Sequence, residues 1–144
     1  MQKQALFCVL TLAFVLVLNV SVCGASQGIP IDIPGTQVHF FTLRYEAATP
    51  PYEQADLVWQ RLSSIFQQWV EEGQNPNSLT AEMVTVETAP SGNKAIYLKG
   101  ILIVEVDEYH AKQNRTNVDQ LAKTWADNLR QGVTVFVESN VPSR

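Results

Sequence analysis

The chain has 144 residues, 46% of them hydrophobic and 17% charged, and its net charge at pH 7 is −4. That length suits one ordinary domain with its own buried core. The few basic residues are scattered and the net charge is negative, so the surface repels phosphate backbones and we expect no nucleic-acid binding.

The first 25 residues have the pattern of a signal peptide. Lys3 supplies a short positive region, the run 5–22 is almost entirely apolar, and small residues follow it. We expect cleavage after Gly24 or Ala25, no membrane insertion afterwards, and a secreted protein in the periplasm or an equivalent extracytoplasmic compartment. Two alternatives stay open. The leader could be retained as a tether, because its apolar run as a helix reaches ~27 Å, or Cys23 could be lipidated.

The remaining chain divides into an extended segment and one domain. Residues 26–36 contain two prolines and two glycines, which favour a linker or a sheet edge over a helix. Residues 37–144 are expected to form a single domain. Both cysteines, Cys8 and Cys23, lie in or beside the leader, so the cleaved domain must fold without disulfides.

Four segments have the composition of strands. Residues 37–45 are rich in branched and aromatic side chains, and the pattern predicts a strand buried mainly on the side of Phe41 and Leu43. The other three are separated by short Gly-containing breaks, which predict an antiparallel meander: 82–88, 94–98 and 101–106.

Two segments have the apolar spacing of amphipathic helices. In residues 52–72 apolar side chains recur at steps of three and four, and Gly73 ends the pattern. The last helix is capped by Thr116 or Asn117 and is expected to continue to about Phe136. A short helical turn is expected within 107–115. The whole pattern predicts an α+β fold, with two long helices packed on one face of a three- to four-stranded, mainly antiparallel sheet.

The densest polar cluster follows the 101–106 strand. Carboxylates and imidazole are the groups that bind divalent cations or act as acid and base, so four residues are candidate metal ligands: Glu105, Asp107, Glu108 and His110. The competing interpretation is a charged strand exit leading into a helix cap, because a hard-cation loop supplies more oxygens and zinc needs further His or Cys. No cofactor motif or activated nucleophile is present, so we expect no cofactor and no catalytic activity.

The tryptophans offer a different kind of candidate. Trp69 and Trp125 fall on apolar helix faces and are expected in the core. Trp59 lies at the rim of its helix's apolar stripe, about 100° from Val58. Exposed aromatics anchor protein interfaces, so Trp59 and Tyr52 are the predicted contact residues for a protein partner.

The order of these features carries a resemblance to a known family. The matching pieces are Pro34-Gly35, Phe40-Phe41, Ala55 with Arg61-Leu62, the segment 101–107, Leu121-Ala122, Trp125-Ala126 and Leu129. In these features the chain resembles the extramembrane N-terminal domain of cyanobacterial small-conductance mechanosensitive channel-like proteins. The resemblance implies a stand-alone secreted copy of an envelope-facing domain. It carries over no channel activity, because we expect no pore segment before Arg144, and no catalytic residue.

Together, the sequence predicts an exported, non-catalytic interaction or sensing module of the cell envelope, with a protein partner. Two alternatives remain: a metal-binding or metal-assisted hydrolytic protein, and a membrane-tethered accessory subunit of an envelope complex.

Overall fold

The structure, a computed structural model, describes residues 26–142, so the predicted leader with Cys8 and Cys23 lies outside the described residues. The strands are β1 (Gln27–Asp32), β2 (His39–Tyr45), β3 (Val84–Thr88), β4 (Lys94–Leu98) and β5 (Ile101–Val106). The helices are α1 (Tyr52–Glu71), α2 (Glu108–Gln113) and α3 (Val118–Asn140), and two 3₁₀ turns, Pro76–Ser78 and Ala81–Met83, connect α1 to β3.

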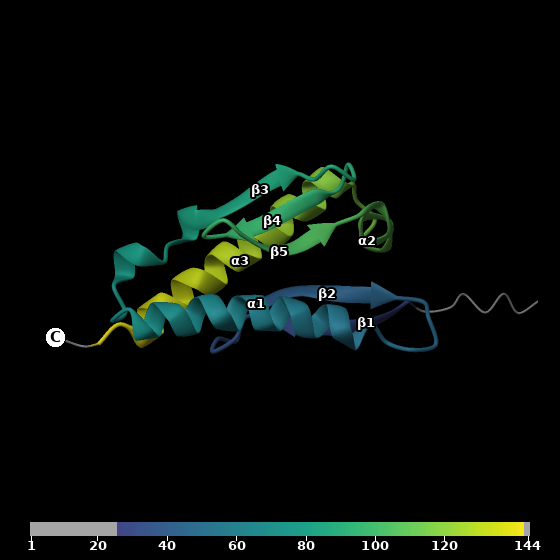
Figure 1. Cartoon of the computed structure of the whole chain (residues 1–144). Coiled ribbons are helices and arrows are strands. Elements are labelled where there is room, and N and C mark those ends of the chain that lie inside the picture. Colours follow the sequence, from purple (N-terminus) through teal and green to yellow (C-terminus); the bar gives the residue numbers. More distant parts are fainter. Residues whose placement is uncertain (1–25, 143–144) are drawn as a thin grey trace, which may run out of the picture.

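The strands form two antiparallel sheets, β1–β2 and β3–β4–β5 (Figure 1). The α+β class and the three-stranded meander are confirmed. The structure adds a second sheet, because the segment predicted as a linker or sheet edge supplies β1, which pairs with β2. The short turn predicted within 107–115 is α2, and α3 begins after Asn117, whose side chain accepts a hydrogen bond from the Gln120 backbone N–H.

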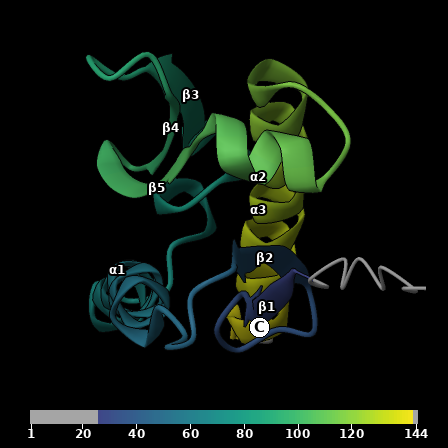
Figure 2. The ribbon, with the colours of Figure 1, turned by 90° about the vertical axis from the view of Figure 1, so that its right-hand side faces the viewer.

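The long helices occupy different positions. α3 packs against β2 and all three strands of the second sheet, whereas α1 lies along β5 and β1 (Figure 2). The sequence predicts that both long helices pack on one face of one sheet, whereas in the structure they pack against different sets of strands. α3 also extends four residues beyond Phe136, because Val133, Phe136 and Val137 all remain on its buried face.

Each sheet contains one bulged residue whose carbonyl is bound by a helix side chain. Phe40 in β2 and Ile103 in β5 have no pairing partner where the register shifts. Asn128 of α3 donates to the Phe40 carbonyl at 2.9 Å, and Arg61 of α1 donates to the Ile103 carbonyl at 2.9 Å. These contacts tie each sheet to a long helix, β2 to α3 and β5 to α1.

The bulge in β2 also changes which side chains are buried. The sequence predicts burial mainly on the Phe41 and Leu43 side, but Phe40 is fully buried as well. The rings of Phe40 and Phe41 meet edge to face, with centroids 4.8 Å apart, and Phe41 stacks on Trp125 at 4.1 Å. An inserted residue breaks the strict alternation of buried and exposed side chains along a strand.

An aromatic cluster joins the C-terminal half of α1 to α3. Phe66 stacks on Phe136 with ring centroids 4.2 Å apart, and Trp69 meets the same ring edge to face at 5.7 Å. The Trp69 indole N–H donates to the Asn75 carbonyl at 2.7 Å. As predicted, Trp69 and Trp125 are core residues. Val70, which continues the apolar spacing, is instead exposed.

Candidate functional site

The N-terminal half of α1 presents two exposed aromatic side chains. Tyr52 is 61% exposed and Trp59 is 49% exposed. They are seven residues apart, so they lie on the same side of the helix. Both line one shallow hollow of about 170 Å³, together with Asp56 of α1 and residues of β1. The structure therefore brings the two predicted contact residues together; we call Tyr52, Asp56 and Trp59 the aromatic surface.

The strand beside the aromatic surface is a poor site for strand addition. β1 pairs only with β2 among the described strands, so its other edge is open. Pro30, which also lines the hollow, lacks a backbone N–H and interrupts the donors along that edge. A partner at this surface therefore has to bind through side chains rather than by extending the sheet.

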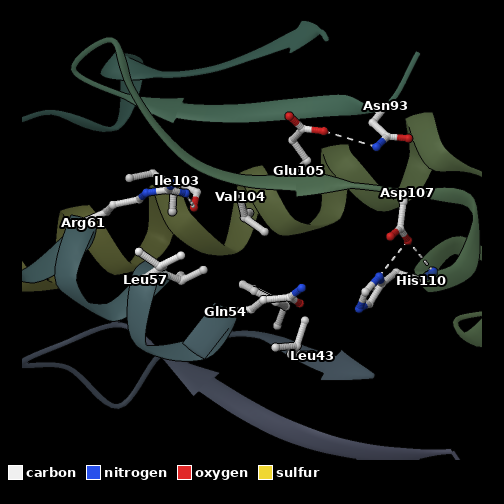
Figure 3. A pocket seen from close by; sticks show the side chains of 12 residues that line it. Leu43, Gln54, Leu57, Arg61, Asn93, Ile103, Val104, Glu105, Asp107 and His110 are labelled. Carbon is white, nitrogen blue, oxygen red and sulfur yellow. Dashed lines mark hydrogen bonds and ion pairs between the residues drawn. The ribbon is translucent and has the colours of Figure 1, made fainter. Parts of the chain in front are cut away.

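A second hollow lies on the opposite flank of α1, between this helix and β5 (Figure 3). It encloses about 280 Å³. Phe41, Leu43, Val58 and Ile103 give it a buried apolar floor. The polar residues that line it are Gln54, Arg61, Asn93, Glu105, Asp107 and His110. We call this hollow the β5 cavity.

The structure separates the four predicted metal-ligating residues. Glu105, Asp107 and His110 line the β5 cavity, whereas Glu108 lies in the exposed first turn of α2. Glu105 accepts hydrogen bonds from the Ser91 hydroxyl and the Asn93 amide. Within residues 26–142 no three His, Cys, Asp or Glu side chains gather closely enough to hold a metal ion.

Asp107 and His110 form a structural pair. Asp107 is the N-cap of α2 and accepts the His110 backbone N–H at 2.8 Å. The same oxygen lies 2.7 Å from His110 Nδ1, and His110 Nε2 lies 3.2 Å from the Arg44 backbone nitrogen. Since the Arg44 N–H donates to Nε2, the Nδ1 atom must carry the ring proton. Both ring nitrogens are thus engaged, Nδ1 with the N-cap of α2 and Nε2 in joining α2 to β2.

The pair sits in a crowded, partly desolvated setting. The His110 ring meets Trp125 edge to face, and its side chain is only 10% exposed. Beside it, burial raises the pKa of the Tyr109 hydroxyl, and the Glu46 and Asp107 carboxylates raise it further against an opposing effect of Arg44. Tyr109 is therefore a neutral phenol at pH 7. Its hydroxyl is buried and has no hydrogen-bond partner among the described residues.

Three cavity residues escape the sequence patterns. Gln54, Leu57 and Arg61 follow one another at steps of three and four, so they form a second stripe on α1. Two of the three are polar, and the hydrophobic periodicity therefore assigns them to the solvated face. Leu57 is 48% exposed at the cavity rim. The stripe faces β5 across the cavity, and this becomes visible only when the structure places β5 beside α1.

Residues 36–135 match the model of a family described as a domain of unknown function (DUF8459), and the chain belongs to this family. The matched range begins just before β2 and ends within α3, so it contains α1 and every residue that lines the β5 cavity. β1 precedes it. No curated protein and no solved structure matches the chain. In residues 26–142 there is no helix long and apolar enough to cross a membrane.

Proposed function

We propose that this protein is an exported, non-catalytic interaction or sensing module of the cell envelope that binds a protein partner through the aromatic surface. The observation that carries the proposal is the convergence of Tyr52 and Trp59 on one hollow while both stay about half exposed or more. Aromatic side chains dominate the energetics of protein interfaces because they combine a large apolar area with few rotatable bonds.

The charge and shape of the surface define the partner's chemistry. Asp56 lines the hollow together with the two aromatic side chains, and Glu53, three residues before it on α1, is exposed as well. A basic side chain entering the hollow would meet a carboxylate and two aromatic side chains. A partner segment with one Lys or Arg flanked by apolar residues therefore suits it best.

The leader and the resemblance support an envelope location. A cleaved leader delivers a free domain, whereas a retained one makes the protein a tethered accessory subunit. The resemblance to a domain that channel-like proteins carry outside the membrane favours the same compartment. Sequencing the N-terminus of protein recovered from cells distinguishes the two forms: we expect a new N-terminus at Ala25 or Ser26, and an intact Met1 would contradict cleavage.

The partner proposal is tested by site-specific photo-cross-linking in the native envelope. We expect a photoreactive residue at position 59 to give one discrete cross-linked species, and the same residue at Ile101 to give none. Ile101 is the matched control, because it is 44% exposed and lies in β5, away from the aromatic surface. Equal cross-linking from both positions would refute the proposal.

A substitution separates binding from stability. We expect Trp59→Ala to change the free energy of unfolding by less than about 0.5 kcal/mol, because half of the side chain is already in water. The same variant should lose most of the cross-linked species formed from a photoreactive residue placed at Tyr52. If Trp59→Ala instead cost several kcal/mol, Trp59 would be a core residue and not a contact.

A further inference from the structure

The β5 cavity has a fixed positive group at one end. Arg61 donates one guanidinium N–H to the bulged Ile103 carbonyl, which holds the side chain against the strand. Among the described residues no carboxylate pairs with Arg61. A guanidinium has five N–H donors, so most of them remain for an anion. The geometry is suited to a carboxylate, which arginine binds through two parallel hydrogen bonds.

The other end of the cavity is negative. The Glu105 carboxylate is held by Ser91 and Asn93 of the β3–β4 turn, through one of its two oxygens. Asp107 likewise uses only Oδ1 for its contacts with His110. No lysine or arginine of the described chain forms an ion pair with Glu105 or Asp107. Figure 3 shows Arg61 at one end of the hollow and Asp107 at the other, with Glu105 between them on the side of β5 that faces Asn93.

A strand edge connects the two ends. β5 pairs with β4 on one side only, so alternate residues turn their backbone N–H and C=O groups away from the sheet. Apart from the Ile103 carbonyl, no outward hydrogen bond of β5 is found within the described chain. Four residue steps separate Ile103 from Asp107, which corresponds to about 13 Å of strand.

We propose that the β5 cavity binds a short peptide of three or four residues in an extended conformation, antiparallel to β5. Arg61 binds its C-terminal carboxylate, and Glu105 with Asp107 binds its N-terminal ammonium group. An extended peptide spans about 3.3 Å per residue, so three or four residues bridge the charged ends. The apolar floor accepts small aliphatic side chains. At about 280 Å³ the cavity lies just below the usual range of ligand pockets, which agrees with so small a ligand.

This inference does not depend on the aromatic surface. Leu57 and Arg61 project from the flank of α1 nearly opposite Trp59, because they lie two residues before and after it and each residue turns the helix by 100°. The peptide site can therefore exist whether or not a protein binds Tyr52 and Trp59. Conversely, loss of partner binding in Trp59→Ala leaves peptide binding untouched.

The test is calorimetric titration of the purified protein with the tripeptide Ala-Leu-Ala. We expect measurable binding of the peptide with free termini. N-acetylation and C-amidation should each weaken it about tenfold, because each removes one charge-assisted contact. Free leucine should bind at least tenfold more weakly than the tripeptide. No heat with the free tripeptide at millimolar concentration, or equal affinity for the blocked peptides, would overturn the proposal.

Two variants assign the two ends. Glu105→Gln should reduce the penalty of N-acetylation, because only the Asp107 carboxylate then remains for the ammonium group, and it should leave the penalty of C-amidation unchanged. Arg61→Met should remove the penalty of C-amidation and leave that of N-acetylation. Glu105 is exposed, so we expect Glu105→Gln to keep the fold. This variant still tests the proposal if Arg61→Met, which loses the contact with the Ile103 carbonyl, weakens the packing of α1. Glu108→Gln is the matched control, since this exposed carboxylate does not line the cavity. If Glu105→Gln kept the full dependence on the free N-terminus, the assigned orientation would be wrong.

Discussion

The two halves of α1 each carry a tryptophan, and the two side chains have opposite environments. Trp69 has no exposed surface, whereas Trp59 is 49% exposed. Ten residues separate them, so they differ by about 80° around the helix axis. That rotation moves an indole from the face that meets α3 to the rim beside β1. The same residue type is therefore a core anchor in one half and a candidate contact in the other.

The packing partners explain this difference. The C-terminal half of α1 rests on the Phe136 ring of α3 through Phe66 and Trp69. The N-terminal half instead has the aromatic surface on one flank and the β5 cavity on the other. The C-terminal half thus fixes the helix to α3, whereas the N-terminal half buries Ala55 and Val58 but also borders both hollows. A change in the anchored half should act on stability, and a change in the other half on recognition.

The largest effect is expected for Trp69→Ala. It removes a fully buried ring together with the indole N–H that donates to the Asn75 carbonyl, so we expect a loss of about 3–5 kcal/mol in the free energy of unfolding. Urea denaturation measures this, with Trp59→Ala as the control that changes the same side chain in the other half. Equal losses in the two variants would mean that α1 is anchored along its whole length.

Helical phase is what the sequence encodes best. The spacing of apolar residues in 52–72 and 118–136 predicts both long helices, and it places Trp69 and Trp125 in the core and Trp59 at the rim. Phase alone overestimates burial at Val70, because it cannot show that nothing packs beyond the end of the apolar stripe. It also cannot show what the polar stripe of Gln54 and Arg61 faces, since that depends on the path of β5.

The strands show a sharper limit. Boundaries of β4 and β5 follow from branched side chains and Gly-containing breaks. The bulges at Phe40 and Ile103 do not, because each depends on a side chain distant in sequence, Asn128 or Arg61, reaching the carbonyl. Those two contacts tie β2 to α3 and β5 to α1, and the β5 cavity lies between β5 and α1. The predicted metal-ligand cluster is continuous in sequence but divided in space, because Glu108 lies in the exposed first turn of α2 while the other three residues line the cavity.

A second, smaller loss of stability is expected for Gly132→Ala, which tests how tightly α3 packs against Ile33. A Cβ at this position would overlap the side chain of Ile33, which is 1% exposed and cannot move aside easily. Overpacking costs about 1–3 kcal/mol, and the better helix propensity of alanine offsets ~1 kcal/mol of it. Thermal melts should therefore show a lower Tm than wild type. Gln131→Ala, on the exposed neighbour, is the control, and a raised Tm for Gly132→Ala would show a loose contact.

Two variants of Asp107, at the end of the β5 cavity, should give one effect similar to that of Gly132→Ala and one smaller. Asp107→Ala removes the α2 cap and the partner of His110 Nδ1, so we expect a loss of about 0.5–2 kcal/mol. Asp107→Asn should cost less than about 0.5 kcal/mol, because an asparagine oxygen caps a helix as well as an aspartate oxygen does. Asp107→Ala should therefore cost more than Asp107→Asn if the residue acts as a hydrogen-bond acceptor.

Asp107→Asn also separates this structural role from the metal hypothesis, since a bound cation needs the carboxylate charge. Melts with added zinc and calcium decide between them: we expect no rise in Tm for wild type, and a rise that Asp107→Asn abolishes would favour the metal site.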